Sequence, residues 1–153
     1  MKSNFKSAQS GFTLVELIVV IIILAILGAV ALPKFMDVTT KAQISAVKAA
    51  GGGLGAGVAL AHAQWVANGS SSADTDGVEG FGAGDINTND AGWPVGTDAA
   101  FNDEQDCIDI WNGVMQGPPS ISDTAGTVEY VAAKGTGGTA NVCTYTYHGG
   151  QAT

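Results

Sequence analysis

The sequence contains no arginine, and its cationic side chains besides two histidines are six lysines. Fourteen aspartate and glutamate residues outweigh them, so the formal net charge is −8. Nucleic-acid binding depends on clustered cations that contact phosphates, and this composition therefore argues against a nucleic-acid partner. Charged residues make up only 13% of the chain while 46% is hydrophobic, which also excludes an acidic disordered chain.

Motifs that build common active sites are also missing from the sequence. It has no nucleophile elbow, no phosphate loop and no metal-ligand spacing, and the glycine-rich run 51–57 is not followed by Lys-Ser or Lys-Thr. The acidic residues stand in polar stretches without the apolar shelter that raises a carboxyl pKa. We therefore predict a protein that is not an enzyme and that uses no cofactor.

What the sequence does contain is a long apolar run near its start. Residues 12–32 include one charged side chain, Glu16, and as a helix they would span about 30 Å, enough to cross the core of a bilayer. The polar segment before the run carries two lysines and is predicted to stay in the cytoplasm. The run is longer than the apolar part of a secretory signal, and no small-residue cleavage site closes it.

Glu16 requires an explanation, because a carboxylate in a membrane helix is unfavourable and usually marks a function. It follows Phe12 by one helical turn. If the chain is cut after Gly11, Phe12 gains an α-ammonium, and the α-ammonium of a neighbouring copy would neutralise Glu16. The alternative is an interfacial glutamate that stays hydrated or protonated.

The order of a short cationic leader, Gly11, Phe12 and Glu16 before an apolar run resembles the signal of type IV pilins and pseudopilins. The resemblance implies that a prepilin peptidase cuts between Gly11 and Phe12 and N-methylates Phe12. It also implies that Phe12, Thr13 and Glu16 serve filament assembly. Pro33 matches the helix-bending proline of the family, and a proline inside a helix removes a backbone donor in any case.

The resemblance implies an α+β pilin fold, with a long N-terminal α-helix and a globular head that carries a small antiparallel β-sheet. Apolar residues recur at helical spacing after Pro33, so the helix is predicted to continue to Val66. The glycine run 51–57 within it marks either a break or a close approach of helices. The expected organisation is a cleaved leader over 1–11, a membrane and filament-core helix over 12–32, its amphipathic continuation over 33–66, a connecting loop region over 67–106 and a head over 107–153 with a disulfide-bounded C-terminal region.

Three short runs in the head have strand character, namely 108–111, 128–131 and 142–147. Turn residues at 117–119 and 135–138 separate them, which predicts an antiparallel sheet.

In the connecting region, Trp93 and Pro94 are predicted to anchor the loop. Phe81 and Phe101 are further candidates for contact with the helix. The default interpretation of His62, on the predicted helix, is a titrating surface imidazole.

The two cysteines, Cys107 and Cys143, lie in the region predicted to be outside the membrane. One well-separated pair in an exported domain favours a disulfide, worth about 3–4 kcal/mol in the chain-entropy model. Metal binding is the weaker alternative, because it needs more ligands and His148 is the one histidine near either cysteine in sequence. The resemblance points to the disulfide as well, since many type IV pilins close a C-terminal surface region in this way.

Cation sites are only weakly indicated. Asp74, Asp76 and Glu79 resemble the start of a calcium loop, in which hard oxygen ligands alternate along the chain. A second acidic cluster lies within 103–109. For both clusters the default interpretation is a solvated loop, so no metal is predicted.

The resemblance implies the major structural subunit of a type IV pilus, which polymerises through its N-terminal helix into a cell-surface filament for attachment and biofilm formation. Residues 33–38 and 107–113 are most similar to the mannose-sensitive haemagglutinin (MSHA) type of pilin. The alternatives are a pseudopilin of a type II secretion system and a minor pilin or ligand-binding adhesin subunit. The implied partners are further copies of the chain, the prepilin peptidase, the inner-membrane assembly machinery and, as a surface ligand, a glycan. The implied location is the inner membrane of a Gram-negative bacterium before assembly and the extracellular pilus afterwards.

Overall fold

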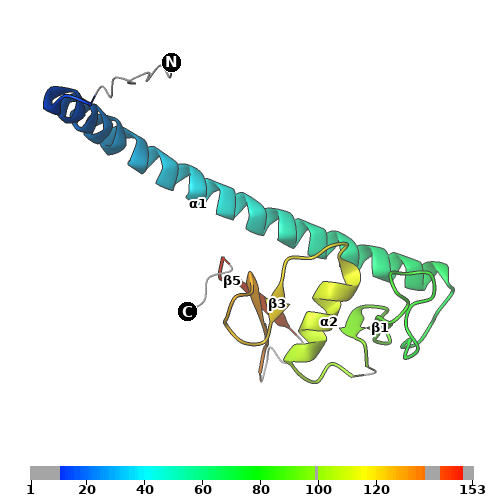
Figure 1. Ribbon diagram of the computed structural model, residues 1–153. Helices are drawn as coiled ribbons and strands as arrows, with labels where there is room; N and C mark the ends of the chain where they lie inside the picture. Colours follow the sequence, from blue (N-terminus) through cyan, green and yellow to red (C-terminus); the bar gives the residue numbers. More distant parts are fainter. Residues whose placement is uncertain (1–10, 99, 137–141, 150–153) are drawn as a thin grey trace, which may run out of the picture. The chain divides into compact units, whose positions relative to one another are not determined.

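The computed structural model describes residues 11–98, 100–136 and 142–149, which form two helices and five short strands (Figure 1). The chain divides into two compact units, Met1–Ala42 and Gln43–Thr153. The predicted leader up to residue 10 and part of the predicted turn at 135–138 lie outside the described residues.

The first helix, α1, spans Leu14–Ala67 and so belongs in part to each unit. It continues through Pro33 and through the glycine run 51–57, although each glycine costs a helix about 1 kcal/mol relative to alanine. The prediction of a helix that reaches Val66 is therefore confirmed. A bend at Pro33 stays a prediction.

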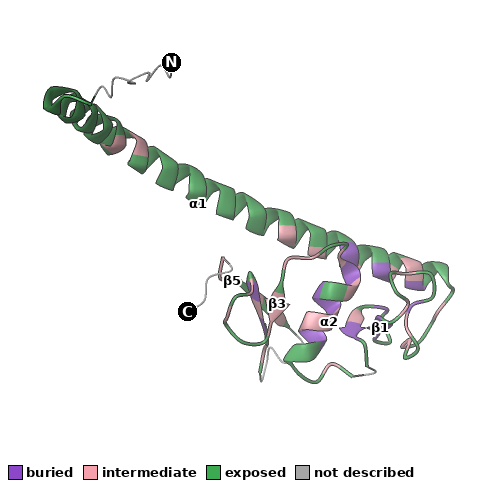
Figure 2. Ribbon diagram, in the orientation of Figure 1, coloured by how far each residue is buried: buried purple, intermediate pink, exposed green. Residues whose placement is uncertain are grey.

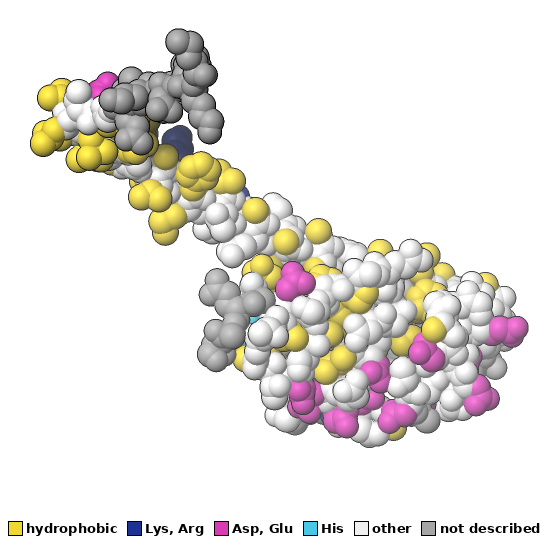
Figure 3. All heavy atoms as spheres, in the orientation of Figure 1, with side chains coloured by type: hydrophobic (Ala, Val, Ile, Leu, Met, Phe, Trp, Pro, Cys, Tyr) yellow, Lys and Arg dark blue, Asp and Glu magenta, His cyan; other side chains and the backbone are white. Residues whose placement is uncertain are grey.

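In the first unit, the large apolar side chains of α1 between Leu14 and Val38 are exposed to solvent (Figure 2). The exposed fraction is 73% for Leu14 and 62% for Val38. One 18-residue window of α1 has a mean hydropathy of 3.1 with none of it buried. By length and composition the helix is thus suited to cross a membrane. Figure 3 shows these hydrophobic side chains along the helix.

The second unit contains the C-terminal part of α1, the short helix α2 (Glu104–Val114) and two small sheets. Strands β1 (Asn87–Thr88) and β2 (Pro94–Gly96) pair antiparallel. Strands β3 (Ile121–Ser122), β4 (Tyr130–Lys134) and β5 (Cys143–Tyr147) form the other sheet in that order.

The α+β class with a long N-terminal helix is confirmed. The expected antiparallel pairing joins β4 and β5, whereas β3 pairs parallel with β4, which makes the sheet mixed. The run predicted at 142–147 forms β5, and the run predicted at 128–131 forms β4 two residues further along.

The strand predicted at 108–111 is wrong, because these residues lie in α2. Asp103 caps the helix: its carboxylate accepts the Gln105 amide at 2.9 Å, and its own amide donates to Asp106 Oδ2 at 2.9 Å. The buried apolar positions of α2, Cys107, Ile110, Trp111 and Val114, follow helical spacing. Over the four residues 108–111 alone, apolar and polar side chains also alternate as in a strand, and the helical spacing becomes visible only over the whole of α2.

Trp111, only 1% exposed, lies at the centre of the core between α2 and the sheet β3–β4–β5. Its ring lies 4.7 Å from that of Tyr130 and 4.9 Å from that of Tyr145, and its indole N–H donates to the Pro119 carbonyl at 3.0 Å. Burial raises the pKa of Tyr130, and the nearby Tyr147 and Glu129 raise it further. Burial also raises the pKa of Tyr145, whose hydroxyl donates to the Cys107 carbonyl at 2.9 Å.

Candidate functional sites

The N-terminus of α1 is closed by a reciprocal cap between Thr13 and Glu16. The Thr13 amide and hydroxyl both donate to Glu16 Oε2 at 2.8 Å, and the Glu16 amide donates to Thr13 Oγ1 at 3.2 Å. This is a capping box, with threonine at the N-cap and glutamate at the third helical position. The sequence analysis missed it, although Thr-x-x-Glu before an apolar run is its usual signature.

The cap positions the Glu16 carboxylate beside the first turn of α1, where unpaired amides favour negative charge. Both bonds from Thr13 end on Oε2. Among residues 11–98, 100–136 and 142–149, no hydrogen bond ends on the second carboxylate oxygen. The cap forms within one chain, and it leaves the Glu16 carboxylate able to bind a group of another chain as well.

A close approach of two helices in the second unit explains part of the glycine run. A Cβ added at Gly57 would stand 2.2 Å from the carbonyl oxygen of Val114, the last residue of α2. One turn earlier, a Cβ at Gly53 would lie 3.5 Å from Met115 Sδ. By contrast, Gly51 and Gly55 have nothing within 4 Å of such an atom. Of the two interpretations of the run, helix approach is therefore confirmed at Gly57.

The predicted disulfide joins Cys107 in α2 to Cys143 in β5, with a Cα–Cα distance of 5.6 Å and a sequence separation of 36. Cys107 is fully buried, so the bond ties the C-terminal strand to the core. The disulfide prediction is confirmed, and the metal alternative for these cysteines is wrong.

Trp93 anchors the connecting region through His62 of α1. The two rings are stacked at 4.1 Å, and His62 Nδ1 donates to the Gly92 carbonyl at 3.0 Å. Gly92 has φ +78°, and a Cβ there would stand 2.3 Å from the Trp65 ring, so only glycine fits. His62 is thus a half-buried structural residue, not the surface imidazole that we expected.

Phe81 and Phe101 differ in their surroundings. Phe81 lines an open groove together with residues of α1. Phe101 instead lies under the ammonium of Lys134, which is 5.4 Å from the ring centroid.

The acidic candidates do not converge on a cation site. Asp74 Oδ1 accepts the Asp76 amide at 3.2 Å, while the Glu79 carbonyl accepts from Asn68 at 2.9 Å. In the part of the chain that the structure describes, no group of three or more His, Cys, Asp or Glu side chains is placed to hold a metal ion.

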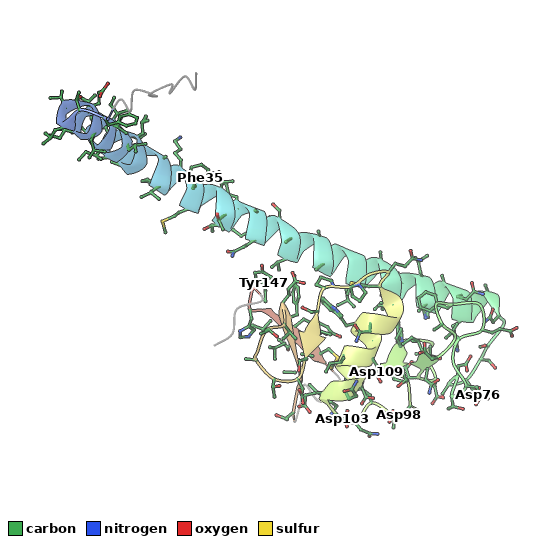
Figure 4. The ribbon with its side chains drawn as sticks, viewed as in Figure 1. Phe35, Asp76, Asp98, Asp103, Asp109 and Tyr147 are labelled. Atoms are coloured by element: carbon green, nitrogen blue, oxygen red, sulfur yellow. A yellow bond between two sulfur atoms is a disulfide. The ribbon has the colours of Figure 1, made fainter. Side chains whose placement is uncertain are left out.

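The second acidic cluster has a structural role. Figure 4 labels Asp103 and Asp109, which mark the two ends of this cluster. Asp103 and Asp106 cap α2, while Asp109 accepts from Thr97 at 2.6 Å. The expectation of a solvated loop is therefore wrong here, because acidic side chains stabilise the first turn of a helix.

Comparison with known proteins finds similarity in the N-terminal region of the chain. Residues 6–32 match the family model described as the prokaryotic N-terminal methylation motif. A fimbrial protein of Neisseria meningitidis serogroup A is 44% identical over 66 residues, which cover 41% of this chain and 39% of that protein. The type IV major pilin protein PilE1 of Neisseria gonorrhoeae is 60% identical over 37 residues, covering 24% and 22%.

The fimbrial protein EcpC of Eikenella corrodens is 50% identical over 52 residues, covering 33% of this chain and 34% of that protein. The chain thus spans 39% or less of the length of these relatives. No solved structure matches it. The N-terminal region of the chain is thus similar to fimbrial proteins and type IV major pilins, and the chain combines it with an α+β fold that has a long N-terminal helix.

Proposed function

We propose that the chain is the major structural subunit of a type IV pilus and that it polymerises through the apolar part of α1. One observation carries this proposal: the helical segment within the stretch that matches the methylation motif is strongly apolar, and none of its most apolar part is buried. Exposed apolar surface of this extent marks an interaction with a membrane or with other protein. A membrane before assembly and a bundle of like helices afterwards would cover it in turn.

In this proposal the prepilin peptidase removes the leader between Gly11 and Phe12 and methylates the new N-terminal amine. The segment 12–32 then anchors the subunit in the inner membrane and later forms the filament core, while 33–66 carries the head. The loop region 67–106 and the head 107–153, including the disulfide-bounded region, form the outer part of each subunit.

Glu16 changes partner in the proposed assembly step. In the single chain its Oε2 is held by Thr13, which orients the carboxylate. In the filament, the α-ammonium of Phe12 from a neighbouring copy binds the same carboxylate and sets the register of the incoming subunit. Away from water this pairing removes the penalty of an isolated charge, so it favours one register over others.

The completed filament is proposed to lie on the cell surface of a Gram-negative bacterium and to serve attachment and biofilm formation, as in the MSHA type. Assembly would use inner-membrane machinery, and a glycan is the proposed surface ligand. A filament retained in the periplasm would instead indicate a pseudopilin.

Electron microscopy of filaments sheared from the native cells, with mass spectrometry of their subunit, tests the proposal. We expect long surface filaments built mainly of a chain that starts at methylated Phe12 and lacks the two thiol hydrogens. A processed subunit found in membranes without surface filaments would overturn the major-pilin assignment. An uncut chain that starts at Met1 would overturn the whole proposal.

A pair of variants separates the cap from the assembly contact. Glu16→Gln keeps an acceptor for the Thr13 cap but loses the charge, so we expect normal processing and at least about a hundredfold fewer filaments, as for a broken buried ion pair. Thr13→Val removes the hydroxyl from the cap but keeps the backbone bond from residue 13 and the charge of Glu16, so filament numbers should fall much less than in Glu16→Gln. Equal filament numbers in Glu16→Gln and wild type would contradict the proposed pairing.

A further inference from the structure

An open groove of about 910 Å³ lies on the second unit, bordered by α1, the loop 81–86 and the segment 112–119. Its α1 side is formed by small residues, among them Ala46, Ala49, Ala50 and Gly53. Because these positions carry no side chain larger than a methyl group, they leave space between the α1 backbone and the opposite wall of the groove. Phe81, Met115 and Pro118 supply apolar walls.

The charged side chains that line the groove are both acidic, Asp85 and Asp109. The Asp109 carboxylate already accepts from Thr97 at 2.6 Å and from Gln105 at 2.7 Å. Asp85 is exposed, and neither a hydrogen bond nor an ion pair is recorded for it among the described residues. The groove therefore favours an apolar occupant that carries a cation at its edge.

The first unit contains a helical turn with this chemistry. In α1, Phe35 is 70% exposed and Met36 is 73% exposed, and Figure 4 labels Phe35 on the helix surface. Lys34 directly precedes them and is exposed as well. The ion pair that the structure records in its described part joins Lys41 to Asp37 at 2.8 Å and does not use Lys34.

We propose that the groove of one copy binds the turn Lys34–Val38 of a second copy, with Phe35 and Met36 against the apolar walls and Lys34 paired with Asp85. This inference rests on the proposed function, because a filament holds many copies side by side. The groove volume of about 910 Å³ is within the roughly 300–1,000 Å³ that encloses a small organic ligand, ample for two side chains. Met115 in the wall is flexible enough to adapt to an aromatic ring.

A zero-length cross-linker tests the contact in filaments of the full chain. A water-soluble carbodiimide joins a carboxylate to an amine with loss of water, and it does so only where the two groups touch. We expect a dimer band on a denaturing gel and, after digestion, a peptide in which Lys34 is linked to Asp85. Dimers in which Asp85 is linked to a different lysine, or to none, would overturn the proposal.

Charge reversal gives a second and independent test. Asp85→Lys and Lys34→Asp each place like charges together and should weaken subunit association on the order of tenfold, seen as fewer filaments surviving a fixed shear. The double variant restores opposite charges and should recover wild-type filament numbers. Asp123→Lys, at an exposed acid outside the groove, is the matched control and should leave them unchanged.

The outcomes separate this inference from the proposed function. Abundant filaments in both single variants would refute the groove contact and leave the pilus subunit intact. Loss of filaments in the single variants without recovery in the double variant would also refute the pairing. Absence of filaments in wild-type cells would refute the proposed function itself.

Discussion

The substitution Gly57→Ala tests whether close packing between α1 and α2 holds the head together. Two effects oppose each other. Alanine favours a helix over glycine by about 1 kcal/mol, which alone would stabilise α1. The new Cβ, however, would stand 2.2 Å from the Val114 carbonyl oxygen and 3.0 Å from the Val114 Cβ. Such an overlap is with backbone, so a side-chain rotation cannot relieve it.

Overpacking of this kind costs roughly 1–3 kcal/mol and more when backbone must move. We therefore expect Gly57→Ala to lower the free energy of unfolding by about 1–2 kcal/mol after the gain in helix propensity. The matched control is Gly51→Ala in the same helix, where nothing lies within 4 Å. It should stabilise the protein by up to about 1 kcal/mol.

Thermal unfolding of the processed chain in detergent, followed by circular dichroism, measures both variants. About 1 kcal/mol corresponds to a shift of the midpoint of roughly 4 °C for a domain of this size. The two substitutions should shift the midpoint in opposite directions. A Gly57→Ala protein that is as stable as Gly51→Ala would refute the close approach of the helices and the argument built on it.

Three further predictions concern the second unit. Replacing Cys107 and Cys143 together by alanine should lower the free energy of unfolding by about 3–4 kcal/mol, measured by denaturant titration, and an unchanged midpoint would show that the bond does not constrain the head. Because burial raises the pKa of Tyr145, the unfolded chain loses that proton near pH 10 before the folded chain does, so stability should fall as the pH rises above 10. In Tyr145→Phe this alkaline decline should be shallower, from a lower starting stability because the bond to the Cys107 carbonyl is lost, whereas an identical pH profile would contradict the assignment. Asp103→Ala removes the α2 cap and should cost about 0.5–2 kcal/mol, while the exposed Asp123→Ala should cost little.

Much of the fold follows from local patterns that a single sequence displays. The apolar run 12–32, the helix to Ala67 and strand β5 could be predicted because periodicity and composition act over neighbouring residues. The pattern of 108–111 predicts a strand only because four residues show alternation as readily as a helical period. The cap at Asp103 was the missing signal, and it identifies the start of α2.

Some candidate site residues can also be predicted from a local motif, whereas the placement of others depends on the fold. Gly11, Phe12 and Glu16 lie within six residues of one another, so the sequence displays them as one motif, and their roles in cleavage, methylation and assembly stay predictions. The Thr13–Glu16 cap is equally local and was readable from its spacing. The acids Asp74, Asp76 and Glu79 are close in sequence too, but the turns between them decide where their side chains point.

The sequence by itself determined the N-terminal motif, the position of the apolar helix and the pairing of its two cysteines, since each depends on composition or on residues close together in the chain. Tertiary structure decided which glycines are packed and which are open, how His62 and Trp93 meet, and which residues border the groove beside Asp85. These features join segments that are far apart along the chain. Their geometry follows from how the elements pack, and no local pattern specifies it.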